Sequence, residues 1–140
     1  MKRIMLVGKS GCGKTTLVQA VNNSDRVHIK TQAVEFHSNM VDTPGEYIEN
    51  RLFYKALIVT SAECDVIALV QSCTDEECIF PPKFASVFPK PVIGIITKSD
   101  SKAVKLSGTV RCLEMSGVKN IYCTSSFTGE GIDVLRKLLE

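Results

Sequence analysis

A chain of 140 residues is long enough to bury its own hydrophobic core, and we expect it to form one domain over residues 1–140. The 17 lysines and arginines nearly balance the 15 aspartates and glutamates and are scattered along the chain, which argues against binding to nucleic acid or to an acidic membrane. No apolar run reaches the length of a membrane span, and the first predicted strand begins at about residue 2. We therefore expect no signal peptide and a cytoplasmic location.

The six cysteines, at positions 12, 64, 73, 78, 112 and 123, form no C-x-x-C pair, and no histidine lies close to one in the sequence. This pattern argues against a zinc site. In a reducing compartment we expect free thiols, several of them small core side chains. Cys12 stands apart because it precedes a predicted helix, whose positive end could lower the pKa of the thiol and make it sensitive to oxidation.

Residues 8–16 form a glycine-rich loop that fits the phosphate-binding pattern G-x-x-x-x-G-K-[ST]. An apolar run over residues 4–7 predicts a buried strand before the loop, and residues 17–21 have helical spacing after it. The glycines let consecutive backbone N–H groups point at phosphate oxygens, and the helix adds the positive end of its dipole. The pattern predicts a nucleotide phosphate site formed by Gly8, Lys9, Ser10, Gly11, Cys12, Gly13, Lys14, Thr15 and Thr16. Lys14 would lie along the β- and γ-phosphates as the principal catalytic residue.

Oxygen ligands for Mg²⁺ are expected from three places. The Thr15 hydroxyl would bind the ion directly, and the carboxylate of Asp42, which begins the segment Asp42-Thr-Pro-Gly, can hold it through water. Gly45 ends this segment, and its N–H can meet the γ-phosphate. Thr31 lies between the first helix and Asp42 and could complete the metal shell, but a solvated loop threonine is an equally good interpretation.

The rest of the chain alternates between strand and helix patterns. We expect strands near residues 34–36, 40–41, 66–70, 92–96 and 121–123, and helices over 47–63, 106–113 and 132–138. Residues 74–91 are irregular, with room for one short helix at 84–87. The apolar runs at 66–70 and 92–96 do not alternate, which is typical of parallel strands covered on both faces. The sequence therefore predicts an α/β fold with three layers, α/β/α, around a mostly parallel sheet of about six strands.

Thr97-Lys98-Ser99-Asp100 follows the strand expected at 92–96 and fits the [NT]-K-x-D pattern of GTP-binding proteins. Guanine presents N1–H and the 2-amino group side by side, and the Asp100 carboxylate can accept from both, whereas adenine offers a lone pair at N1. The Lys98 stem can lie over the base. Alone this pattern is a weak signal, but it is strong when it follows the glycine-rich loop and Asp42 in this order. It therefore predicts GTP or GDP as the ligand, bound together with Mg²⁺. Thr97, Lys98 and Asp100 would contact the base.

Ser125 and Ser126 follow the last predicted strand and resemble the S-A-K segment of Ras-like GTPases, in which a backbone N–H meets guanine O6. Together the motifs resemble the translation-factor-related P-loop GTPases, which implies a Ras-like G domain. Glu46 stands where Ras-like proteins carry the glutamine that orients the attacking water. Its carboxylate can accept a hydrogen bond from that water but would be repelled by the γ-phosphate. The favoured alternative for Glu46 is a surface residue at a helix start.

Residues 30–36, 41–51 and 80–85 together resemble the EutP/PduV family of ethanolamine- and propanediol-utilisation proteins, and the resemblance runs from residue 1 to residue 139. It implies a small bacterial GTPase-like protein encoded with the enzymes of bacterial microcompartments, in a family for which ATP is named as often as GTP. Because Glu46 replaces glutamine and no arginine stands out as a built-in finger, we expect slow intrinsic hydrolysis. A partner, or a second copy in a homodimer, would be needed to speed it.

Three functions stay open on the sequence. The first is a Mg²⁺-dependent switch or slow GTPase that serves ethanolamine or propanediol utilisation. The second is an ATP-dependent phosphotransferase that acts on a small acid such as acetate, although no acceptor site is evident. The third is a non-enzymatic protein that docks on the shell or enzymes of a microcompartment through the irregular residues 74–91.

Overall fold

The computed structural model describes residues 2–21, 35–37, 40–75, 77–99, 106–126 and 128–138, with the backbone alone for residues 35–37. Thr31 and Asp100 lie outside the described residues, so the metal role of the first and the base-recognition role of the second stay predictions.

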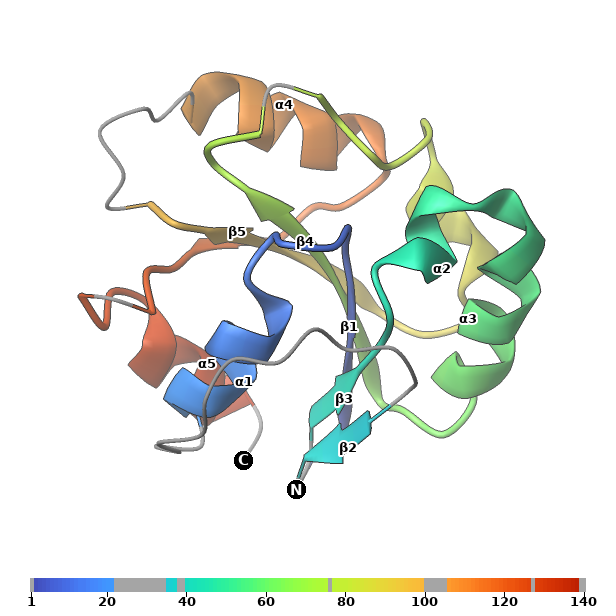
Figure 1. Ribbon diagram of the computed structural model, residues 1–140, viewed down its shortest axis with the longest axis horizontal. Helices are drawn as coiled ribbons and strands as arrows, with labels where there is room; N and C mark the ends of the chain where they lie inside the picture. Colours follow the sequence, from blue (N-terminus) through green and yellow to red (C-terminus); the bar gives the residue numbers. More distant parts are fainter. Residues whose placement is uncertain are drawn as a thin grey trace.

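One six-stranded sheet, with strand order β2-β3-β1-β4-β5-β6, runs through the centre of the molecule (Figure 1). The strands are β1 (Ile4–Val7), β2 (Glu35–His37), β3 (Met40–Asp42), β4 (Val66–Ser72), β5 (Val92–Thr97) and β6 (Ile121–Cys123). All neighbouring pairs are parallel except β2 and β3, which pair antiparallel at the edge. The prediction of a mostly parallel sheet of about six strands is confirmed.

Helices cover both faces of this sheet, and the side chains of β1 show how the layers form. Ile4 and Leu6 pack in a core cluster with α1 (Lys14–Val21) and α5 (Ile132–Leu138) on one face. Met5 and Val7 point to the opposite face, where the cluster includes residues of α2 (Glu46–Glu49), α3 (Tyr54–Ser61) and α4 (Leu106–Met115). Because successive strand residues point to opposite faces, a continuous apolar run buries both faces. The predicted three-layer fold is confirmed. No helix in the described ranges is long and apolar enough to cross a membrane.

The helix expected over residues 47–63 is broken into three pieces, α2, the 3₁₀-helix η1 (Arg51–Phe53) and α3. Asn50 causes the break because its backbone is extended, with φ −125° and ψ 119°, and its side-chain oxygen accepts a hydrogen bond from Leu52 N at 3.0 Å. An asparagine that caps a following helix in this way ends the preceding one. The apolar spacing of the sequence did not reveal this break.

The segment between β4 and β5 is irregular, as predicted, and contains the expected short helix as η2 (Phe84–Val87). Aromatic rings hold it against α3: Phe84 packs edge-on against Tyr54 at 5.2 Å between ring centroids, and against Phe88, which follows η2, at 5.5 Å. These contacts supply the buried apolar surface that a longer helix would otherwise provide.

Two of the cysteines differ from expectation. Cys78, in the segment after β4, forms a disulfide with Cys112 of α4, whereas the other four cysteines are free. The prediction of free thiols was wrong for this pair. The two residues are 34 positions apart, and no local pattern shows that the segment after β4 passes alongside α4.

Candidate functional site

Most of the predicted site residues that the structure describes lie at the carboxyl edge of the parallel strands. The glycine-rich loop follows β1, Asp42 ends β3 and Thr97 ends β5. β1 lies between β3 and β4, and β4 pairs with β5, so these loops emerge along one edge of the sheet (Figure 1). Ligands of open α/β sheets bind at this edge.

The glycine-rich loop has a backbone that requires glycine at two of its predicted positions. Gly11 and Gly13 have φ angles of 82° and 100°, in the left-handed region that other residues avoid. Cys12 N donates to Lys9 O at 3.2 Å, which makes a turn, and Leu17 N donates to Gly13 O at 2.8 Å, which starts α1. The turn therefore leads directly into a helix N-terminus, an arrangement that favours anions.

Lys14, the predicted catalytic residue, is the first residue of α1 and is only 5% exposed. Its ammonium group lies inside the loop, where Nζ donates to Gly8 O at 2.6 Å and to Lys9 O at 3.1 Å. Hydrogen bonds to carbonyl oxygens offset the cost of burying an ammonium group, but they do not cancel its charge. The loop therefore holds a net positive charge at its centre.

Cys12 does not have the acidic thiol that its position suggested. Its side chain is 1% exposed and packs in the core cluster with α1 and α5. Burial raises the pKa of the Cys12 thiol above its ordinary value, although the nearby charge of Lys14 acts in the opposite direction. Lys14 Nζ lies 3.8 Å from the sulfur, but the thiol is buried in the core, so the expected redox sensitivity of Cys12 is not supported.

Thr15 and Asp42 come together as predicted for a metal site. Thr15 Oγ1 donates to Asp42 Oδ2 at 2.8 Å, and Asp42 is fully buried. Hydroxyl and carboxylate oxygens are the donors that Mg²⁺ prefers, and Mg²⁺ usually takes one or two protein ligands together with phosphate and water. The oxygen pair beside the loop therefore fits this ion. No group of three or more histidine, cysteine, aspartate or glutamate residues in the described part of the chain could form another metal site.

Gly45 packs directly against the phosphate loop. A Cβ atom added to Gly45 would overlap with Ser10 N and with Ser10 Oγ, so no larger residue fits without movement. Gly45 is the N-cap residue of α2, and its carbonyl oxygen accepts from Ile48 N and from Glu49 N, both at 3.2 Å. The close packing of Gly45 therefore places the start of this helix against Ser10. Gly45 therefore lies against the glycine-rich loop, and its role at the γ-phosphate stays a prediction.

The glutamate that reaches the loop is Glu49 and not Glu46. Glu49 Oε1 lies 3.4 Å from Ser10 N, whereas the exposed side chain of Glu46 makes no polar contact with any described residue. The two residues are three positions apart and share one face of α2, but Glu49 lies one turn further along the helix and is the one that reaches Ser10 N. Sequence reasoning missed Glu49 because the helix containing it was expected to continue, which left its direction undefined.

Thr97 and Lys98 bind the phosphate loop from the side of β5. Thr97 Oγ1 donates to Cys12 O at 2.5 Å, and Lys98 Nζ donates to Gly11 O at 2.9 Å. Lys98 adopts a left-handed φ of 60°, a backbone strain that persists only where the surroundings hold it. Thr97 and Lys98 therefore fix the position of the loop.

Ser125 and Ser126 lie at the end of β6, next to the T-K-x-D segment. Ser99 N donates to Thr124 O at 3.1 Å, which joins the two loops. Ser125 is fully buried, its N–H donates to Glu130 O at 2.9 Å, and its hydroxyl accepts from Thr128 N at 3.1 Å. Ser125 therefore shapes the turn, while Ser126 is half-buried beside it.

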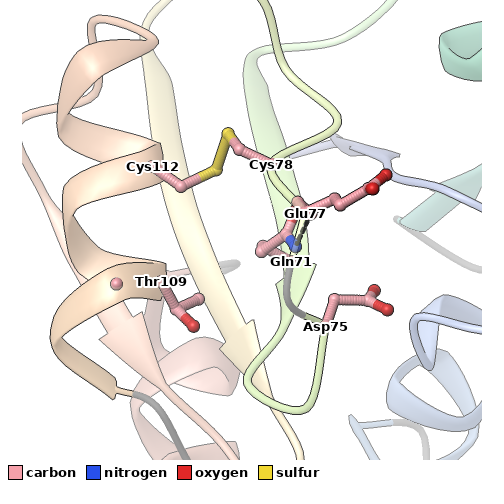
Figure 2. A pocket seen from close by; sticks show the side chains of 7 residues that line it. Gln71, Asp75, Glu77, Cys78, Thr109 and Cys112 are labelled. Carbon is pink, nitrogen blue, oxygen red and sulfur yellow. Dashed lines mark hydrogen bonds between the residues drawn. A yellow bond between two sulfur atoms is a disulfide. The ribbon is translucent and has the colours of Figure 1, made fainter.

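A further acidic residue near the loop was not predicted. Asp75, from the segment after β4, accepts from Lys9 Nζ at 3.4 Å. A pocket with a volume of about 100 Å³ also lies on this side. Its wall consists of Gln71, Asp75, Glu77, Cys78, Gly108, Thr109 and Cys112 (Figure 2). The pocket is separate from the predicted phosphate residues, none of which lines it.

Comparison with known proteins identifies the family. The family model for ethanolamine utilisation and propanediol utilisation, PduV-EutP, matches residues 1–140. The propanediol utilization protein PduV of Citrobacter freundii is 40% identical over 134 residues, which cover 95% of this chain and 89% of the relative. A probable acetate kinase, EutP of Escherichia coli K12, is 37% identical over 119 residues, 84% of this chain and 75% of the relative.

A crystal structure of an Era variant from Aquifex aeolicus, bound to GDP and AlF4⁻, has the same fold with a TM-score of 0.66. The alignment covers 99% of this chain and 56% of Era, and 20% of the residues are identical. This likeness shows the P-loop GTPase-like fold alone. The matches of the family model and of the two relatives show that the chain belongs to the PduV-EutP family of ethanolamine- and propanediol-utilisation proteins.

Proposed function

We propose that the protein binds a guanine nucleoside triphosphate together with Mg²⁺ and hydrolyses it slowly, as a switch in ethanolamine or propanediol utilisation. The observation that carries the proposal is the pair formed by Thr15 Oγ1 and Asp42 Oδ2, 2.8 Å apart, beside the buried ammonium of Lys14. A cation and a pair of oxygen ligands at the start of one helix are what a metal-bound polyphosphate requires.

The roles of the residues follow from this arrangement. The ammonium of Lys14 would exchange the carbonyl oxygens of Gly8 and Lys9 for phosphate oxygens and stabilise the charge that develops on them. Thr15 and Asp42 would hold Mg²⁺, which neutralises phosphate charge when it is bound. Asp100 would select guanine, and the expectation rests on the T-K-x-D pattern.

The carboxylate of Glu49 would lower the affinity for a triphosphate below that of the same loop without this charge. This carboxylate approaches Ser10 N at the side of the loop that Gly45 closes, and a γ-phosphate there would meet a like charge. Binding of a triphosphate would therefore push α2 away, which makes this helix the element that reports the nucleotide state. Glu46, exposed beside it, would reach an attacking water only after such a movement.

The proposal is tested by the release of inorganic phosphate from GTP. We expect slow release that requires Mg²⁺ and that falls strongly in the Thr15→Ala variant, since this change removes one of the two metal ligands. Release that continues without Mg²⁺ or survives Thr15→Ala would contradict the proposal.

The alternative is phosphoryl transfer from ATP to a small acid. It is favoured by the names of relatives, since EutP of Escherichia coli and EutP of Salmonella typhimurium are both described as probable acetate kinases. Formation of acetyl phosphate from acetate and ATP, lost in Lys14→Ala, would favour this alternative over the switch. The pocket beside the loop gives it no support, because two carboxylate residues, Asp75 and Glu77, line the cavity and a carboxylate substrate would be repelled.

A further inference from the structure

The disulfide between Cys78 and Cys112 lies outside the nucleotide site and has the features of a reactive bridge. Cys78 is exposed, whereas Cys112 is 8% exposed and belongs to α4. Their Cα atoms are 5.6 Å apart, a usual distance for a disulfide. An external thiol would therefore meet the bridge at Cys78. Exposed disulfides are the ones that exchange readily with small thiols.

The disulfide holds the segment after β4 over the buried side chain of Gln71. We call residues 73–75 and 77–80 the strap, which runs from the end of β4 past α4 (Figure 2). Beneath it, Gln71 is 2% exposed and donates from Nε2 to Glu77 O at 3.1 Å, while its Oε1 has no hydrogen-bond partner among the described residues. A buried amide oxygen without a partner favours any opening that admits water. Without the bridge, the hydrogen bond from Gln71 and the ion pair between Asp75 and Lys9 would hold the middle of the strap, between the buried side chains of Cys73 and Phe80.

The strap also contacts the phosphate loop. Figure 2 shows the Asp75 side chain pointing away from α4, and its Oδ1 accepts from Lys9 Nζ at 3.4 Å. The closed strap thus places a negative charge beside the loop. Release of the strap would free Asp75 to leave Lys9, and the loop would then carry one more uncompensated positive charge.

We propose that Cys78 and Cys112 form a reversible thiol–disulfide modification site that fastens the strap, with low-molecular-weight thiols and their disulfides as the reaction partners. In reduction, an external thiolate attacks Cys78 Sγ and the bond to Cys112 breaks, so that Cys112 leaves as a thiolate and takes up a proton. A second external thiolate then attacks the external sulfur of the mixed disulfide, which forms the external disulfide, and Cys78 leaves as a thiolate and takes up a proton. Two external thiols are oxidised and the protein disulfide is reduced to two thiols. Oxidation is the reverse.

The test is a count of thiols on the full chain. The protein is equilibrated in mixtures of reduced and oxidised glutathione, denatured in acid, alkylated and weighed by mass spectrometry. We expect six alkylated cysteines in the reducing mixtures and four in the oxidising ones, with one transition between them. Cys112→Ser should remove the transition, and Cys123→Ser, which alters a free cysteine, should keep it. Six thiols in every mixture, or a bridge that no mixture reduces, would overturn the proposal.

A second measurement tests the effect on the phosphate loop, and this part rests on the proposed nucleotide function. We expect the reduced protein to bind a nucleoside triphosphate about twofold to fivefold more tightly than the oxidised protein. Asp75→Asn should bind equally tightly in both states. Equal affinities in the wild-type protein would overturn the link between strap and loop. If the thiols cycle but no nucleotide binds in either state, the proposed function fails while the modification site stands.

Discussion

The loops after β1 and β4 leave the same edge of the sheet from neighbouring parallel strands, yet they are held in place differently. The loop after β1 takes its conformation from its own residues, through left-handed glycines and through Lys14, whose ammonium binds two carbonyls of the loop. Thr97 and Lys98 then hold this preformed loop in position. The strap after β4 is fixed by distant partners, a disulfide to α4 and an ion pair to Lys9. A loop that carries its own conformation can be recognised from a motif, whereas one held by remote contacts cannot. Different changes should therefore disrupt the two loops.

The largest expected effect is on the first loop. Lys14→Ala should weaken nucleoside triphosphate binding about a thousandfold, or ~4 kcal/mol, because it removes the buried cation that the phosphates would meet. Lys9→Ala is the matched control from the same loop. The Lys9 side chain is 38% exposed and pairs with Asp75, so its loss should change the affinity less than about fivefold. Isothermal titration calorimetry measures both, and equal losses would show that the loop attracts phosphate only by its general positive charge.

The next effect is on the strap. Reduction of the Cys78–Cys112 disulfide should lower the free energy of unfolding by about 3 kcal/mol, because the bridge closes a loop of 34 residues in the unfolded chain. Urea denaturation with and without a reducing agent measures the difference. Cys112→Ser should show the lower stability in both conditions, while Cys123→Ser should still respond to the reducing agent. Equal stability of the oxidised and reduced wild-type protein would mean that the strap is held without the bridge.

A smaller effect tests the contact between the first loop and α2. Gly45→Ala should lower the free energy of unfolding by about 2 kcal/mol, because the added methyl group would overlap with Ser10 and force α2 away. Gly108→Ala in α4 is the control, since a Cβ there meets no atom within 4 Å and alanine favours a helix, so stability should rise by up to about 1 kcal/mol. If Gly45→Ala is as stable as the wild type, the close packing is not maintained in solution.

The smallest effect distinguishes the two glutamates of α2. Glu49→Gln should raise the affinity for GTP relative to GDP about fivefold, because it removes a like charge near the expected γ-phosphate without changing the shape of the side chain. Glu46→Gln should leave this ratio unchanged, since Glu46 makes no polar contact with a described residue. If only Glu46→Gln changes the ratio of GTP to GDP affinity, then Glu46, and not Glu49, is the glutamate that faces the γ-phosphate.

The sequence predicted the fold well because its strands are short apolar runs and its helices have regular spacing. The runs at β4 and β5 indicated strands covered on both faces, and Leu69 and Val70 of β4 do point to opposite clusters. The break at Asn50 was missed because a side chain that caps the next helix can be recognised only once the chain direction is known.

The sequence predicted the residues of the candidate site at those positions where a motif requires one particular residue type. Gly13, Lys14, Thr15 and Asp42 lie where the motifs place them. Glu49 and Asp75 could not be predicted, because each approaches the loop from an element whose direction depends on packing. The disulfide is the clearest case, since two cysteines 34 residues apart become neighbours only when the strap crosses α4.

The most direct test of the central claim is calorimetric titration of the nucleotide-free protein with GTP, GDP, ATP and ADP, each with and without Mg²⁺. The proposed site predicts that guanine nucleotides bind at least about 100-fold more tightly than adenine nucleotides, because the Asp100 carboxylate would pair with guanine and oppose N1 of adenine. It also predicts that Mg²⁺ strengthens the binding of GTP through Thr15 and Asp42. Equal binding of both bases, or a preference for ATP, would contradict the guanine switch and direct the search to a phosphoryl acceptor.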